Sequence, residues 1–233
     1  MMDRHDFHHN FIFMKNFWNL LLKEAMLEWR RRLAFNSILL YIGSTVFVCY
    51  LSFGVRSDEL SPITWNAVFW IIMLFVSINA MAKSFADEQR GRHYYYYSLA
   101  SPQAIMLSKM LYNSLLMIVF SATALLFYSM VLGNPVEDMA FFFLAIFLGA
   151  VGFSSALTLI SGIAYKAAAG ASLMAILSFP VILPMLLMII KLSRNAIDGL
   201  ARSASYDEIV TLMSVNVMLA AISYVLFPYL WRS

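Results

Sequence analysis

Six long runs of apolar residues follow one another along the chain, separated by short polar stretches. Each is about as long as the roughly 20 residues that a helix needs to cross a bilayer core. We expect helices, because a spanning segment must satisfy its own backbone hydrogen bonds and a barrel would show alternation over about ten residues instead. The expected spans are 34–54, 64–84, 105–132, 140–164, 170–190 and 209–230.

The first 33 residues carry a different pattern, in which Lys15, Asn19 and Lys23 recur every four positions. This pattern predicts an amphipathic helix lying at the membrane interface rather than a seventh span. A soluble helix packed on a partner stays open as an alternative, although two tryptophans and the arginines at 30–32 favour lipid headgroups. The apolar side of the predicted helix consists of Met14, Trp18, Leu21, Leu22, Ala25 and Trp29.

The composition excludes a water-soluble fold. Of the 233 residues, 62% are hydrophobic and 12% are charged, whereas soluble domains carry roughly 25% charged residues. A soluble chain of this length could not bury so much apolar surface. The sequence therefore predicts an all-α integral membrane protein, with an interfacial helix in residues 1–33 and a six-helix transmembrane domain in residues 34–233.

The basic residues predict the orientation of these spans. With both termini in the cytoplasm, only Arg56, Lys191, Arg194 and Arg202 of the 16 lysines and arginines lie outside, so twelve lie inside. This is the positive-inside bias of membrane proteins. We therefore expect a multi-pass protein of the bacterial inner membrane, in contact with lipids. The net charge of +3 is too small to indicate a nucleic-acid partner.

Two polar connections are long enough to carry a function. Residues 85–104 are expected to form a cytoplasmic loop, and residues 191–208 an outward-facing loop with one or two short helices. The first contains four consecutive tyrosines at 94–97. Tyrosine has an apolar ring and a polar tip, so this tract suits contact with a partner protein. An aromatic belt that anchors the helix end in the membrane stays open as the alternative.

Residues typical of catalysis are missing from the expected membrane core. No ionisable residue lies far from the end of a span, and the four histidines are all assigned to the cytoplasmic side. The motifs GxxxxGK[ST] and HExxH do not occur, and Cys49 is the single cysteine. We expect no catalytic residue, no metal site and no resident cofactor, so any nucleotide would bind to a partner.

Two features of the later spans allow more than one interpretation. Small residues of the fourth span, such as Gly149 and Gly152, allow close helix approach. They would serve either packing within the chain or an interface between subunits. In the fifth span, Pro180 and Pro184 each remove a backbone donor, so a kink or local unwinding is expected. The kink would be purely structural or would shape a translocation path.

The segment after the second expected span contains a pattern made by Phe85, Asp87, Gly91, Leu99, Ser101, Pro102 and Lys109. This pattern resembles the cytoplasmic segment of the haem exporter protein B (CcmB) family. The six spans, the length, the basic N-terminal helix and the prolines of the fifth span add to this resemblance, which covers nearly the whole chain. The tyrosine tract departs from the leucine-rich stretch expected of the family.

The resemblance implies a permease of the six-helix ABC exporter type in cytochrome c biogenesis. It implies a CcmA-type ATPase as partner, which would hold ATP and magnesium, together with a CcmC-type haem-handling protein, a CcmE-type haem chaperone and a second permease chain. ATP hydrolysis would drive haem export or release of the haem-loaded chaperone, with haem only in transient contact with this chain. The residues expected to contact the ATPase are Phe85, Asp87, Glu88, Arg90, Gly91, Arg92, Tyr94, Tyr95, Tyr96, Tyr97, Ser101 and Pro102.

Two other functions stay open at this point. An exporter permease of the same type could move a lipid, a drug or a polysaccharide. A non-transporting scaffold subunit would belong to a different class of protein.

Overall fold

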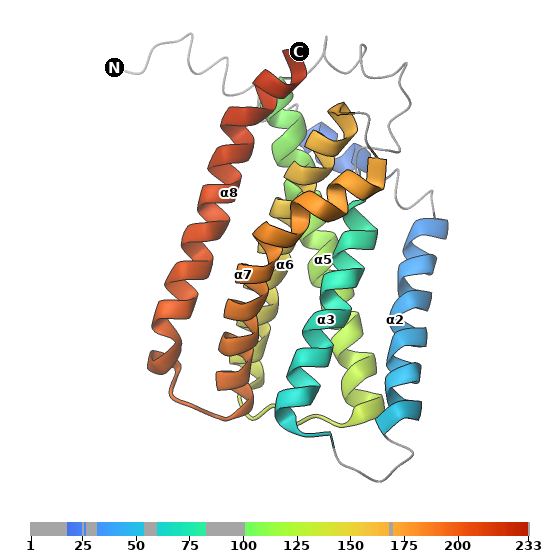
Figure 1. The fold of residues 1–233 in the computed structure, drawn as a ribbon, viewed down its shortest axis with the longest axis vertical. Coiled ribbons are helices and arrows are strands. Elements are labelled where there is room, and N and C mark those ends of the chain that lie inside the picture. The colour runs from blue at the N-terminus through green and yellow to red at the C-terminus, as the bar shows by residue number, and fades with distance from the viewer. Residues whose placement is uncertain are drawn as a thin grey trace.

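In the computed structural model the described residues include six long helices, which form one antiparallel bundle (Figure 1). The structure describes residues 18–24, 26, 32–53, 60–82, 101–167 and 170–232. All six helices are long and apolar enough to cross a membrane, which confirms the predicted all-α class. The helices are α2 (Arg32–Phe53), α3 (Pro62–Met81), α5 (Pro102–Leu132), α6 (Met139–Lys166), α7 (Gly170–Ile197) and α8 (Tyr206–Arg232). Residues 18–24 and 26 are also helical, and a short 3-10 helix, η2 (Arg202–Ser205), precedes α8.

Several helix boundaries follow directly from local sequence. Both α3 and α5 begin with a serine at the N-cap and a proline in the first turn, Ser61 with Pro62 and Ser101 with Pro102. Serine accepts a hydrogen bond from an otherwise unpaired amide, while proline has no amide to leave unpaired. At the other end of α5, Gly133 adopts a positive φ of 79°, a conformation that glycine tolerates best.

Helix α6 lies at the centre of the bundle. It packs against α3, α5, α7 and α8, and it is the most buried of the six spans, whereas α2 and α8 are mostly exposed. The exposed surfaces of these outer helices are apolar, as Leu40 and Phe47 on α2 and Val217 and Val225 on α8 illustrate. In a bilayer such faces contact lipid tails, so their exposure carries no hydrophobic penalty.

Two glycines of α6 allow its neighbours to come close. A Cβ at Gly149 would lie 2.9 Å from the Trp70 ring of α3, and a Cβ at Gly152 would clash with Met185 of α7 and Asn216 of α8. These two positions therefore serve packing within the chain, the first of the two roles that the sequence left open.

Helix α7 extends further than the sequence predicts. Residues 191–197 continue the helix instead of opening the expected loop, because Leu192, Ser193, Ala196 and Ile197 remain buried against the bundle. Both prolines lie inside the helix, and their side chains are on its exposed side. Figure 1 shows that α7 bends, with its first turns crossing the top of the bundle obliquely.

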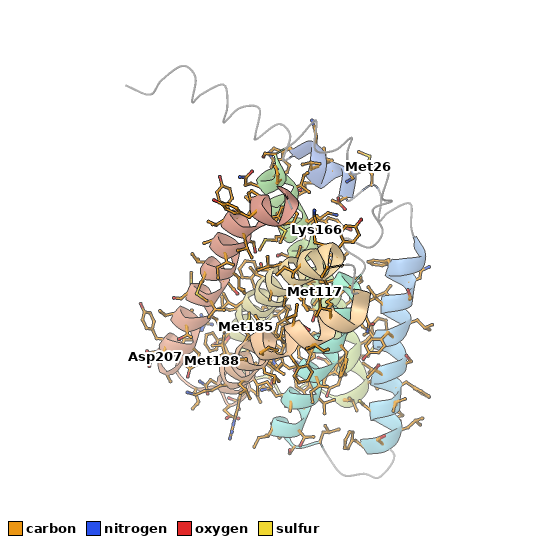
Figure 2. All side chains as sticks on the ribbon, turned by 45° about the horizontal axis from the view of Figure 1, so that its top comes forward. Met26, Met117, Lys166, Met185, Met188 and Asp207 are labelled. Carbon is orange, nitrogen blue, oxygen red and sulfur yellow. The ribbon has the colours of Figure 1, made fainter. Side chains whose placement is uncertain are left out.

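The two ends of the bundle differ in charge. We call the end where α8 finishes the C-terminal end, and the opposite one the Asp138 end; Figure 2 shows Met26 and Lys166 at the former and Asp207 at the latter. Among the described residues, basic groups outnumber acidic ones at the C-terminal end and acidic groups outnumber basic ones at the Asp138 end. The C-terminal end has Lys23, Glu24, Lys109 and Lys166; the Asp138 end has Glu137, Asp138, Lys191, Arg194, Asp198, Arg202, Asp207 and Glu208.

The central position of α6 predicts unequal effects of two glycine substitutions. Gly149→Ala should lower the free energy of unfolding by about 1–3 kcal/mol, because the new methyl group displaces the rigid Trp70 indole. Gly43→Ala on α2, where a Cβ would meet nothing within 4 Å, should leave stability unchanged or raise it by up to about 1 kcal/mol. Thermal unfolding in detergent micelles measures both, and equal shifts would contradict the packing role of Gly149.

Candidate functional site

Most of the residues expected to contact an ATPase fall in a segment that the structure does not describe. The residues that lie outside the described part of the chain are Phe85, Asp87, Glu88, Arg90, Gly91, Arg92, Tyr94, Tyr95, Tyr96 and Tyr97. Ser101 and Pro102 are described. They form the N-terminal end of α5, so the structure shows the helix into which the predicted loop leads.

The first turn of α5 is fixed by its own sequence. Ser101 Oγ accepts a hydrogen bond from the Ala104 amide at 3.4 Å, and Pro102 occupies the first helical turn. The Ser101 carbonyl accepts from the Ile105 amide at 3.2 Å. A helix with its end capped in this way can transmit a push along its axis instead of fraying.

One side of this turn is covered by the N-terminal helical segment. Leu20 packs with Ala104 and Ile105 in a small apolar cluster, in which Ala104 is fully buried. On the outward side of the same segment, Trp18, Leu22 and Met26 are exposed at intervals of four residues. An exposed apolar stripe of this kind is typical of a helix lying in the membrane interface.

An ion pair joins the same two elements one turn further along α5. Lys109 Nζ lies 3.2 Å from Glu24 Oε1, and the Lys109 side chain is only 2% exposed. Lys23 Nζ approaches the same oxygen at 3.1 Å. Burial acts to raise the pKa of Glu24, but the two lysine charges outweigh it and hold the pKa below the usual value of a glutamate. The carboxylate is therefore ionised at neutral pH.

The other side of the same α5 turns faces the rest of the bundle. Met106 and Met110 pack with Leu159 of α6 and Phe227 of α8. The start of α5 is thus held between the N-terminal segment on one side and two transmembrane helices on the other. Any displacement of this helix end must move at least one of these contacts.

Polar hydrogen bonds continue the α5–α6 contact toward the middle of the bundle. Asn113 Nδ2 donates to Thr158 Oγ1 at 2.7 Å, and the hydroxyls of Ser114 and Ser154 lie 2.6 Å apart. Away from water such bonds fix the register of two helices. The first four turns of α5 therefore combine an ion pair, apolar packing and buried hydrogen bonds.

A second group of polar contacts ties the helices together at the Asp138 end. Arg202 donates to both carboxylate oxygens of Asp138, at 2.9 and 3.1 Å, and Asp138 also caps α6 by accepting from the Phe141 amide at 3.0 Å. The Arg202 hydrogen bonds and the Phe141 amide hold the pKa of Asp138 below its usual value. Lys191 of α7 pairs with Glu208 of α8, so α6, α7 and α8 are joined there.

Sequence reasoning missed the partnership of Glu24 with Lys109. In the amphipathic pattern Glu24 belongs to the polar face, which is expected to meet water, whereas its carboxylate contacts a buried lysine 85 positions further on. The weak signal was Lys109 itself, because a lysine two turns inside a long apolar segment needs a partner. No group of three or more potential metal ligands gathers among the described residues.

The long apolar helices and their exposed apolar faces make this chain a multi-pass α-helical membrane protein. A family model described as CcmB protein matches residues 15–226. The chain therefore belongs to the CcmB family, the permease subunits of the haem exporter in cytochrome c maturation, and the resemblance found in the sequence is confirmed. No curated protein matches the chain.

Proposed function

We propose that this permease couples ATP hydrolysis by a CcmA-type ATPase to haem export, or to release of a haem-loaded CcmE-type chaperone, during cytochrome c maturation. The observation that carries the proposal is the family match over residues 15–226. ATP and magnesium stay on the ATPase, a CcmC-type protein handles haem nearby, and a second permease chain completes the membrane part. In this proposal haem is cargo that contacts this chain only transiently.

The coupling element in this proposal is the expected loop at 85–104, except that its last three residues, 102–104, form the first turn of α5. It joins α3 to α5 at the C-terminal end of the bundle, which is the end that we expect to face the cytoplasm. A closing ATPase moves the loop as a rigid body, and the capped start of α5 carries that movement to Met106 and Met110. Their contacts with α6 and α8 then change the packing of the transmembrane helices.

The charge difference between the two ends supports a cytoplasmic placement of both termini. The C-terminal end of the bundle carries the excess of basic residues, as the cytoplasmic face of an inner-membrane protein does. The exposed Trp18, Leu22 and Met26 also suit a segment lying on that face.

Alanine substitution of the coupling loop tests the central claim. Replacing Asp87, Gly91 and the four tyrosines at 94–97 should lower both ATPase co-purification and cytochrome c yield at least about tenfold, the effect of losing roughly 1.4 kcal/mol of binding. Alanines at Asn134 and Val136, in the connection at the Asp138 end, serve as the control. Unchanged co-purification and cytochrome c yield in the loop variant would rule out the proposed coupling.

The two serine caps offer a matched pair of substitutions. Ser61→Ala and Ser101→Ala each remove an N-cap before a proline and should cost about 1 kcal/mol of stability. Only Ser101→Ala loosens the helix end next to the coupling loop, so only this variant should reduce the ATPase rate that depends on the permease. An equal reduction in both variants would mean that stability, not coupling, is affected.

Cysteine labelling tests the orientation. In a Cys49→Ala chain, a membrane-impermeant maleimide added to right-side-out vesicles should react with Asn134→Cys, at the Asp138 end. It should react with Gly91→Cys only after the membrane is permeabilised. The opposite pattern would place the coupling loop outside and contradict the proposed function.

A further inference from the structure

We propose that residues 18–24 and 26, with the ion pair between Glu24 and Lys109, form a brace that sets the position of the first turns of α5, and that this brace is required for coupling. We call residues 18–24 and 26 the brace segment. The inference rests on the proposed function in its second half, since coupling presupposes the ATPase, whereas the docking of the brace on α5 is independent of it. Glu24 and Lys109 are positioning residues, because they act on the coupling loop through α5.

The contacts place the brace at the point where a push would enter the bundle. Leu20 covers Ala104, three residues after the N-cap of α5, and Glu24 meets Lys109 about one turn later. The two contacts are four residues apart on the brace segment and four to five apart on α5. The two helical elements therefore touch over a full turn, which fixes their relative orientation as well as their distance.

The ion pair is the specific part of this contact. In or near lipid, the apolar contact of Leu20 gains little over contact with a lipid tail. The Lys109 side chain is only 2% exposed, and removing a partner from a buried ion pair is strongly destabilising. The pair therefore selects the docked position of the brace over positions in which Leu20 faces lipid.

The outer side of the brace connects it to the membrane. The apolar stripe that lies in the interface consists of Trp18, Leu22 and Met26, which are 57%, 50% and 60% exposed. A brace held in the membrane plane resists lateral movement, so the start of α5 keeps its place relative to the bilayer when the loop before it is pushed. Force on the loop is then directed into α5 and toward α6 and α8.

The docking of the brace is tested with a reporter on α5. Ala104 is fully buried, and in a Cys49→Ala chain the Ala104→Cys thiol should react with maleimide slowly. Glu24→Gln and Lys109→Met should each raise this labelling rate at least about tenfold, because breaking a buried pair changes a local equilibrium by more than that factor. An Ala145→Cys reporter, buried in α6, should not change and excludes general unfolding.

The functional half is tested by charge reversal in the complete exporter complex. Glu24→Gln and Lys109→Met should lower the cytochrome c yield and the permease-dependent ATPase rate at least about tenfold, and the double variant Glu24→Lys with Lys109→Glu should restore at least half of both. Arg194→Gln, which breaks the exposed pair with Asp198 at the other end, is the control and should have no effect.

Each outcome decides between the inference and the proposed function. An unchanged Ala104→Cys labelling rate would overturn the docking of the brace by the ion pair. Raised labelling with full activity would overturn the requirement of the brace for coupling. If the charge reversal restores neither the slow labelling of Ala104→Cys nor the activity, the ion pair is not the cause of the effects of the single variants. If the wild-type chain does not co-purify with any ATPase, the proposed function fails, while the labelling result still shows whether the brace docks. If Lys109→Met fails to fold, the Glu24→Gln variant and the charge reversal remain decisive.

Discussion

Apolar side chains gain little by leaving lipid for protein, and this constraint shapes the whole bundle. Helices that cross a membrane are held together by close packing and by hydrogen bonds shielded from water. Helix α6 meets both requirements. Its glycines bring Trp70, Met185 and Asn216 into contact with its backbone, and it touches four of the other five helices. The outer helices then need only one packed face each.

Three asparagines inside the spans provide directional contacts between helices. Asn66 of α3 donates to the Ile190 carbonyl of α7 at 2.9 Å, Asn113 of α5 donates to α6, and Asn216 of α8 donates to the Leu148 carbonyl of α6 at 3.2 Å. The free-energy cost of shielding an amide from water is offset only when a hydrogen-bond partner lies at the same level along the neighbouring helix. These bonds therefore set the vertical register of neighbouring helices, which apolar packing alone specifies weakly.

The sequence predicted the elements of this fold better than their partnerships. Hydropathy is a local signal, so all six helices could be predicted directly. Their starts were predicted less well, because α3 begins at Pro62 and α5 at Pro102, two and three residues before the expected spans 64–84 and 105–132. The extension of α7 to Ile197 could not, because Lys191 and Arg194 look like loop residues until the burial of Leu192 and Ser193 is known. The contact of Glu24 with Lys109 depends on two segments 85 positions apart, and periodicity alone does not specify such a pairing.

The hydrogen bonds and ion pairs at the Asp138 end have a mechanical consequence. Arg202 with Asp138, and Lys191 with Glu208, tie the beginning of α6, the end of α7 and the beginning of α8 to one another. Helices that are held together at one end can separate only by rotating about that end, which then acts as a hinge. Helix α8 has 27 residues and is about 40 Å long. A small tilt of α8 about this hinge therefore produces the largest displacement at the opposite end of the helix, where Phe227 lies against Met106 and Met110 of α5.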